Sequence, residues 1–255
     1  MAVTNSIAAR KPMADKAVEY QVNGATVRLS PSIVRNYLTN GDGRVSDQEV
    51  AMFINLCRYQ GLNPLIKDAY LIKYGNQAAT IVTSKDAISK RAMRNPNYAG
   101  HQAGVIVMDQ KTGELDYRTG AFTLPNETLI GGWAKTYVKG YEVPIEVAVS
   151  FNEYAGRKKD GSLNSMWASK PGVMIRKVAL VASLREAFPE ELQGMYASEE
   201  VNTEIDDTMV APVEIPGQPE QAPQPEPEPA FEPGPIRIDT PEAAQAAMDD
   251  LKGVF

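Results

Sequence analysis

Four short runs with strand character lie close together in the middle of the chain. GVIVMD, LDYRTGAFT, IGGWAKTYV and IEVAVSF fall within residues 104–151, and turn signals at 111–113, 125–126 and 139–140 separate them. Such short connections leave no room for crossover helices, so we expect the strands to pair antiparallel. Helical patterns lie on both sides of this block. The sequence therefore predicts an α+β fold, with helices packed on an antiparallel sheet to form a basic groove.

Helix boundaries are marked by their start and stop signals. Ser46 and Glu49 form a capping box that opens a helix running to about Gln60, and Gly61 stops it. Four apolar residues share one face of this helix and are expected in the core: Val50, Phe53, Ile54 and Cys57. Further helices are predicted over 30–38, 84–94 and 171–188, and a β-hairpin over 69–83.

Charge divides the chain into two unlike parts. Residues 1–200 carry a net charge of +4 and residues 201–255 carry −10, and ten of the 18 prolines lie between Pro212 and Pro241. An acidic, proline-rich segment buries too little apolar surface to offset its chain entropy. The expected regions are a mobile N-terminus (1–20), a core domain (21–203), a disordered linker (204–238) and a short C-terminal helix (239–255).

The most basic stretch runs from Arg157 to Arg185 and holds seven basic residues against one acid, Asp160. It combines a Ser/Asn-rich loop, an exposed-looking tryptophan, Trp167, and a helix that begins at Pro171. Because cations neutralise phosphates and exposed rings stack on bases, this stretch is expected to bind a nucleic-acid strand. Its candidate residues are Lys158, Lys159, Trp167, Lys170, Arg176, Lys177 and Arg185.

The helix after Pro171 is nearly all apolar, so we expect it to be embedded in the core. Helical periodicity directs Lys177 and Arg185 toward one surface and Arg176 toward another. An arginine buried against a carboxylate is an alternative interpretation for either arginine.

A second basic region covers residues 67–94 and holds six cations against Asp68 and Asp86. By itself it is typical of a solvated helix face beside a charged hairpin edge. Two basic regions in one domain favour a shared groove. The candidate residues here are Lys67, Lys73, Lys85 and Arg91.

Trp133, Lys135 and Tyr137 alternate on one face of a predicted strand. That face can stack bases and contact phosphates, or it can pack in the core with the lysine reaching solvent. The strand alone favours the core, and Trp133 and Lys135 are kept as candidates.

Signatures of metal binding and catalysis are weak. Residues 42–49 mimic half of an EF-hand loop through Asp42 and Glu49, but Leu38 stands where the first carboxylate is required. One cysteine and one histidine cannot build a zinc cluster or an internal disulfide, and GxxxxGK[ST], GxGxxG and GxSxG are absent. We therefore expect no catalytic residue, metal or cofactor. A calcium-regulated binding module and a metal-dependent nuclease stay as alternatives.

Several blocks together resemble the RecT/Bet superfamily of phage single-strand annealing proteins, most closely its Bet type. These are VSDQEVAMFINLCRYQGLNPLIKDAYLIKY, SKDAISKRA, GGWAKTY and WASKPGVMIRKVALVASLREAFPEELQGMY, in this order over about residues 30–200. The resemblance implies a protein that is not an enzyme and that anneals complementary DNA strands without ATP in homologous recombination. It implies binding of single-stranded DNA and of the annealed duplex, and assembly into rings or helical filaments.

Within these blocks the resemblance suggests three DNA contacts: Lys67, Arg176 and Arg185. Two positions where a well-known member has lysine hold Gly172 and Val178 here, so binding there would rely on Lys170 and Lys177. The resemblance further suggests that the C-terminal peptide recruits a phage exonuclease or a host single-strand-binding protein. No signal peptide or membrane span is evident, so a cytoplasmic location in a bacterial host is expected.

Overall fold

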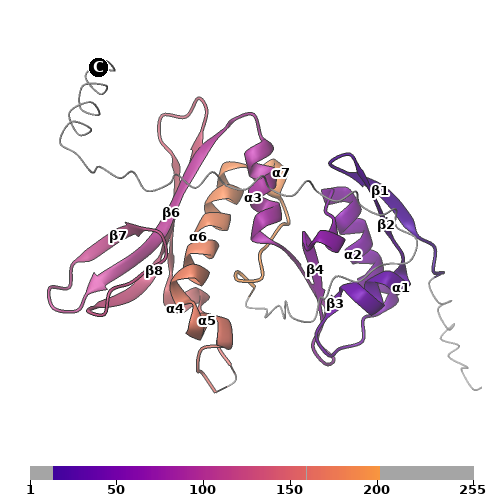
Figure 1. Ribbon diagram of the computed structural model, residues 1–255, viewed down its shortest axis with the longest axis horizontal. Coiled ribbons are helices and arrows are strands. Elements are labelled where there is room, and N and C mark those ends of the chain that lie inside the picture. Colours follow the sequence, from indigo (N-terminus) through magenta and orange to yellow (C-terminus); the bar gives the residue numbers. More distant parts are fainter. Residues whose placement is uncertain (1–13, 159, 202–255) are drawn as a thin grey trace, which may run out of the picture. The chain divides into compact units, whose positions relative to one another are not determined.

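Helices and antiparallel sheets alternate along the part of the chain that the computed structural model describes, residues 14–158 and 160–201 (Figure 1). This confirms the predicted α+β class. These residues belong to one compact unit, residues 1–214. The linker predicted at 204–238 and the helix predicted at 239–255 lie outside the described residues, as do residues 1–13. No helix within the described ranges is long and apolar enough to cross a membrane.

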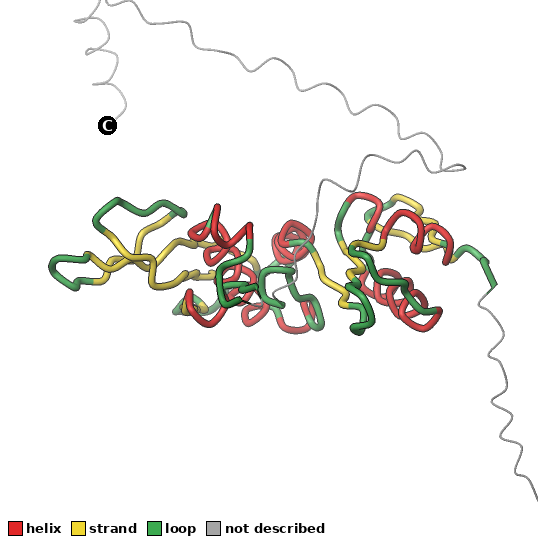
Figure 2. The backbone as a smooth tube through the Cα atoms, turned by 90° about the horizontal axis from the view of Figure 1, so that it is seen from below, coloured by secondary structure: helices red, strands yellow, loops and turns green. Residues whose placement is uncertain are grey.

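The largest described sheet contains the four strands expected from the sequence, in the order β7-β6-β8-β9 and antiparallel throughout. Its strands are β6 (Tyr98–Asp109), β7 (Leu115–Thr119), β8 (Glu127–Val138) and β9 (Ile145–Ser150). β6 and β8 are longer than predicted because the polar ends of both strands continue the pairing beyond their apolar centres. Figure 2 traces these strands and the helical segments beside them.

Helix α6 (Pro171–Ala187) covers one face of this sheet and is the embedded helix that the sequence predicts. Two glycines allow the close approach. A Cβ atom at Gly132 of β8 would lie 2.5 Å from the carbonyl oxygen of Ile175, and one at Gly172 would lie 2.4 Å from that of Ala121. Thr136 and Ser183 add a buried hydrogen bond of 2.7 Å between sheet and helix. The contact therefore joins backbone to backbone and leaves little freedom in where α6 lies.

The other elements precede β6 or surround α6. In chain order they are β1 (Val18–Val22), β2 (Ala25–Leu29), α1 (Pro31–Ile33), a π-helical turn (Val34–Leu38), β3 (Thr39–Asn40), α2 (Asp47–Gln60), a 3-10 turn (Pro64–Ile66), β4 (Ala69–Ile72), β5 (Thr80–Thr83), α3 (Lys85–Arg94), α4 (Phe151–Tyr154), α5 (Ser165–Ser169) and α7 (Pro189–Leu192). One cluster of buried apolar side chains runs through the unit and includes Val27, Phe53, Ile88, Val105 and Ile175.

The hairpin of β1 and β2 was not predicted. Asn23 and Gly24 form its two-residue turn with φ angles of 51° and 84°. Positive φ at both positions is the geometry that an Asn-Gly pair favours in a hairpin. Strand β1 begins at Val18, inside the stretch that was expected to be a mobile N-terminus.

The predicted ends of α2 are confirmed. Ser46 accepts from the Glu49 backbone N–H and Glu49 accepts from that of Ser46, which completes the capping box. Gly61 ends the helix in the left-handed region, and Leu62 N–H donates back to Cys57. The predicted hairpin appears as β4 and β5, and the predicted helix after it as α3. β3, which pairs parallel with β4, was not predicted.

Replacing Gly132 by alanine is expected to destabilise the fold. The new methyl group would press on the α6 backbone, and inserting a methylene into a packed site costs about 1–3 kcal/mol. Urea unfolding of Gly132→Ala measures the loss, with Thr128→Ala, at an exposed position of the same strand, as the control. Equal stability of Gly132→Ala and the wild type would contradict the close helix–sheet contact.

Candidate nucleic-acid interface

Helix α3 carries the cations that the structure brings together. The hydroxyl of Ser84 caps its first turn by accepting from the Ala87 N–H at 3.1 Å. The buried face of the helix is formed by Ala87, Ile88 and Ala92. The polar positions in between face away from the core and contribute to two hollows, which share Lys90.

The first hollow lies between α3, β6 and α6, which pack against one another. Its volume is about 360 Å³, at the low end of the range for small-ligand pockets. Arg176 of α6 is oriented by a hydrogen bond of 3.1 Å from its Nε to the carbonyl oxygen of Ala103. We call this hollow the α3–α6 pocket. Its lining residues are Lys85, Asp86, Ser89, Lys90, Met93, His101, Arg176 and Leu180.

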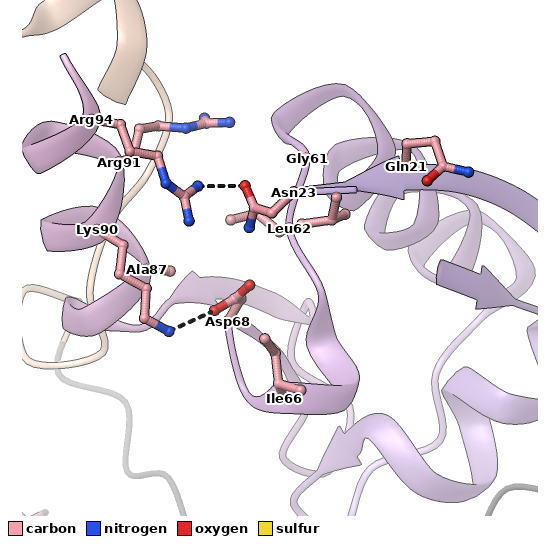
Figure 3. A pocket seen from close by; sticks show the side chains of 11 residues that line it. Gln21, Asn23, Gly61, Leu62, Ile66, Asp68, Ala87, Lys90, Arg91 and Arg94 are labelled. Atoms are coloured by element: carbon pink, nitrogen blue, oxygen red, sulfur yellow. Dashed lines mark hydrogen bonds and ion pairs between the residues drawn. The ribbon is translucent and has the colours of Figure 1, made fainter. Parts of the chain in front are cut away.

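The second hollow lies on the other side of α3, toward the β1–β2 hairpin (Figure 3). Arg94 donates to the side-chain oxygen of Asn23 at 2.5 Å, and Lys90 Nζ lies 3.9 Å from a carboxylate oxygen of Asp68. Ile66 and Asp68 both line this hollow, so Lys67, between them in the chain, lies beside it. Lys67 itself is not one of the described residues that line this hollow.

Five cations line these two hollows. Arg91 is described below, and we call the other four the α3 basic surface: Lys85, Lys90, Arg94 and Arg176. Their charges affect the titratable groups nearby. The hydrogen bond from Lys85 lowers the pKa of Asp86, and Lys90 and Lys177 add to this effect. Burial lowers the pKa of His101, and the charges of Arg176 and Lys85 lower it further. Cations from α3 and α6 are therefore close enough to influence the same groups.

Arg91 has a structural role that the sequence did not reveal. Its guanidinium donates to the side chain of Gln60 at 2.6 Å and to the carbonyl oxygen of Glu191 at 3.2 Å. It also donates to the backbone of Gln60. Burial lowers the pKa of Arg91, with a further contribution from Arg94. These bonds join α2, α3 and α7, so Arg91 has few donors left for a phosphate.

The side chain of Lys73 is likewise bound to another residue of the fold. Its Nζ lies 2.7 Å from Glu49, which also accepts from the backbone of Ser46 at 2.7 Å and of Ala79 at 2.8 Å. Together these bonds lower the pKa of Glu49 to about 2, and the hydrogen bond from Lys73 has the largest effect. Both carboxylate oxygens of the residue that would complete an EF-hand loop are therefore used by protein groups. Within the described residues there is no group of three or more His, Cys, Asp or Glu placed to hold a metal ion.

Lys177 and Arg185 lie on one surface of α6, as predicted, but both are paired with the segment after α7. Lys177 Nζ lies 2.8 Å from Glu199, and Arg185 pairs with Glu200 and lies over the ring of Tyr196. Only 9% and 6% of the two glutamate side chains is exposed. The alternative interpretation thus holds for Arg185 in part: the arginine is paired to a buried carboxylate, but its own side chain is 22% exposed.

The prediction that Trp167 is exposed in a loop is wrong. Asn164 caps the short helix α5, and Trp167 within it is 1% exposed and contacts the ring of Phe151 edge-on. The ring packs close to Gly156, where a Cβ atom would lie 2.9 Å from it. Trp167 is a core residue in this structure and cannot stack on a base there.

Trp133 is also buried, at 5% exposure, as the strand pattern favoured. It lies on the sheet face opposite α6, since its neighbour Gly132 faces the helix. Lys135 Nζ is 5.9 Å from the centre of its ring and 3.1 Å from Glu146. Lys158 and Lys170 are exposed on the segments around α5, and Lys159 lies outside the described residues.

Four residues of this interface were not among the predicted site residues: Ser89, Lys90, Arg94 and His101. Lys90 and Arg94 had been noted only as part of a basic region. The i, i+4 spacing along α3 was the available signal for Lys90 and Arg94. Nothing local in the sequence marks Ser89 or His101, because their position depends on how α3, β6 and α6 pack.

The Lys73–Glu49 pair predicts a pH-dependent contribution to stability. The pKa of Glu49 is lower in the folded chain than its ordinary value of 4.5, so the stabilisation is complete above 4.5 and is lost as pH falls toward 2. The stability difference between the wild type and Glu49→Gln should therefore shrink in this window, measured by urea unfolding at a series of pH values. Glu142→Gln, in an exposed turn, is the control. A difference that does not change with pH would contradict the assignment.

Truncating Trp167 is expected to affect stability before any binding function. Removing a large buried aromatic side chain costs about 3–5 kcal/mol. Trp167→Ala should therefore lower the thermal unfolding midpoint strongly, while Met166→Ala, 39% exposed on the same short helix, should change it little. A Trp167→Ala variant of unchanged stability and weaker DNA binding would restore the stacking interpretation.

Comparison with known proteins gives two findings. The chain is 30% identical over 137 residues to "Uncharacterized protein UU154" of Ureaplasma parvum serovar 3, a match that covers 54% of this chain and 52% of that protein. The chain thus spans about half the length of this curated relative.

A family model described as "RecT family" matches residues 25–212, which include every described element from β2 to α7. This family is associated with phages, with DNA binding and with recombination by single-strand annealing. The chain, with basic side chains gathered around α3, belongs to the RecT family.

Proposed function

We propose that this protein binds single-stranded DNA and anneals complementary strands without ATP during phage homologous recombination. The observation that carries the proposal is the convergence of Lys85 and Lys90 of α3 with Arg176 of α6 in one pocket, from two blocks about 90 residues apart, with Arg94 in the adjoining hollow. Membership of the RecT family supports it.

The physical task of annealing fits such a surface. Two strands repel each other through their phosphates, and annealing requires this repulsion to be neutralised while the bases stay accessible. Lysine and arginine supply the neutralising charge and release counterions, which makes binding dependent on salt. The recognition of sequence is left to base pairing. We therefore propose a protein that acts on the strands without catalytic residues, metal or cofactor.

The DNA path that we propose follows α3. It crosses the α3–α6 pocket at Lys85 and Arg176, passes Lys90, and reaches Arg94 and the neighbourhood of Lys67. Lys177, paired with Glu199 at the side of α6, would join this path only by exchanging its carboxylate partner for a phosphate. Exposed Lys158 and Lys170 are available for a further stretch of strand.

The assembly and the partners are proposals of the same kind. We propose that copies of the chain form a ring or helical filament that holds both the single strand and the annealed duplex. Residues 239–255 are proposed to recruit a phage exonuclease or a host single-strand-binding protein in the bacterial cytoplasm. These residues lie outside the described part of the chain.

The test of function is a fluorescence annealing assay with complementary oligonucleotides, with and without ATP and magnesium. We expect the protein to accelerate annealing equally in both conditions and to leave the DNA intact. Cleavage of the DNA when magnesium is present would favour the nuclease alternative. No acceleration in dilute salt would refute the proposal.

The Lys85→Ala/Lys90→Ala double variant is expected to weaken binding to single strands of any sequence and to slow annealing. On a single strand each lost phosphate contact reduces the slope of log affinity against log salt by about 0.7, so the pair should reduce it by about 1.4. Fluorescence anisotropy with oligothymidylate at several salt concentrations measures this. Lys111→Ala, in the exposed turn between β6 and β7, removes a lysine elsewhere and is the control. Equal loss in the control would show that only total charge matters.

A further inference from the structure

We propose that the α3–α6 pocket holds one backbone phosphate of the bound strand, and that a proton is taken up at His101 when the phosphate enters. This inference deepens the proposed function and rests on it. It names a subsite for a phosphodiester group and makes DNA binding depend on pH.

The charges in the pocket favour an anion. Lys85, Lys90 and Arg176 outnumber the one carboxylate, Asp86, which lies 2.7 Å from Lys85. Arg176 is fixed by its bond to Ala103, so its remaining guanidinium donors are held in place. A fixed guanidinium beside flexible ammonium groups suits an oxyanion, since both can donate charge-assisted hydrogen bonds.

An unused hydroxyl gives an independent indication of a ligand. The Oγ of Ser89 is buried, yet it has no hydrogen-bond partner among the described residues. Ser89 lies one turn beyond Lys85 on α3 and lines the same pocket. Buried polar atoms are nearly always satisfied in folded proteins, and an exception calls for a missing partner. A phosphate oxygen in the pocket would accept a hydrogen bond from Ser89 once this hydroxyl, which is closed off from solvent, turns toward the pocket.

His101 lies on β6 where α3 and α6 meet. The titratable and charged groups around it are Lys85, Asp86 and Lys90 from α3, Arg176 from α6, and Tyr98 from its own strand. The hydroxyl of Tyr98 lies 2.5 Å from Nδ1 of His101. Because a hydroxyl can donate or accept, this contact suits both the neutral and the charged imidazole.

Without an anion, the surroundings favour the neutral form of His101. Burial and the nearby cations Arg176 and Lys85 hold its pKa below the ordinary 6.5. A phosphate between these groups would reverse the electrostatic part of this effect, because a negative charge favours the imidazolium form. The pKa of His101 is then higher in the complex than in the free protein, so binding takes up a proton.

The sign of the pH dependence follows from this difference. Affinity for DNA rises as pH falls between the bound and the free pKa of His101, and it is independent of His101 outside that window. One proton limits the effect to about tenfold in affinity for each pH unit. No other side chain has an ordinary pKa in this range, and His101 is the sole histidine of the chain.

The experiment uses the full chain and follows the imidazole signals of its single histidine by NMR across about pH 5 to 8, a range that spans the ordinary histidine pKa. Titrations are recorded alone, with inorganic phosphate and with oligothymidylate. We expect oligothymidylate to raise the pKa of His101, and the affinity measured by anisotropy to rise toward low pH. The His101→Gln variant should bind with an affinity that no longer changes in this window.

Ser89→Ala tests the hydroxyl separately. It should weaken oligothymidylate binding severalfold at every pH, whereas Ser165→Ala, at an exposed serine, should not. If oligothymidylate binds but leaves the pKa of His101 unchanged, the phosphate subsite is refuted while the proposed function stands. If inorganic phosphate raises that pKa and DNA does not, the pocket is an anion site unrelated to the strand. If no strand binds at any pH in dilute salt, the proposed function itself is refuted.

Discussion

The backbone contact between α6 and the four-stranded sheet determines where the cations of this protein lie. Gly132 lets the α6 backbone approach β8, and Gly172 lets it approach Ala121 in the segment after β7. A Cβ atom at either position would lie within about 2.5 Å of a carbonyl oxygen, a distance that packed interiors do not tolerate. With α6 fixed, Arg176 reaches the carbonyl oxygen of Ala103 and stands beside His101 on β6. Helix α3 packs against α6 and completes the pocket with lysines. The interface is therefore a consequence of helix–sheet packing, in which Arg176 takes part through its bond to Ala103.

The structure divides the basic residues into two groups that sequence alone cannot distinguish. Lys73, Arg91 and Arg185 hold parts of the fold together through Glu49, Gln60 and Glu200. Lys85, Lys90, Arg94 and Arg176 form the α3 basic surface. Arg91 also lines the second hollow, but its hydrogen bonds to Gln60 and Glu191 hold elements of the fold together. The local sequence around a cation is alike in both groups. The partners Glu49, Gln60 and Glu200 lie 15 to 31 residues away along the chain from the cations that they bind. Local basic stretches of the sequence indicated a nucleic-acid binder, but tertiary contacts determine which cations are available.

Most of the secondary structure could be predicted because its signals are local. The Ser46 capping box, the Gly61 stop and the alternating apolar runs each act over a few residues, and the structure contains the corresponding elements. The Asn23-Gly24 hairpin carried an equally local signal that was missed. Trp167 was misjudged for the opposite reason. Its Ser/Asn-rich surroundings resemble a loop, but Asn164 uses its side chain to start a helix that turns the ring into the core.

The site was less predictable because it depends on charges held close together by the fold. Like charges in one pocket repel, and this chain moderates the repulsion in two ways. Asp86 pairs with Lys85, and burial beside the cations lowers the pKa of His101, which favours its uncharged form. In both arrangements the lysines and Arg176 keep their positive charges. The pocket therefore remains favourable for an anion that enters from solvent. A chain with a net charge of −6 can therefore present a local cationic site, because the potential at a surface depends on nearby groups more than on the total. Such a site suits the proposed binding of a DNA strand through its phosphates. Recognition of the sequence is then left to base pairing with the complementary strand.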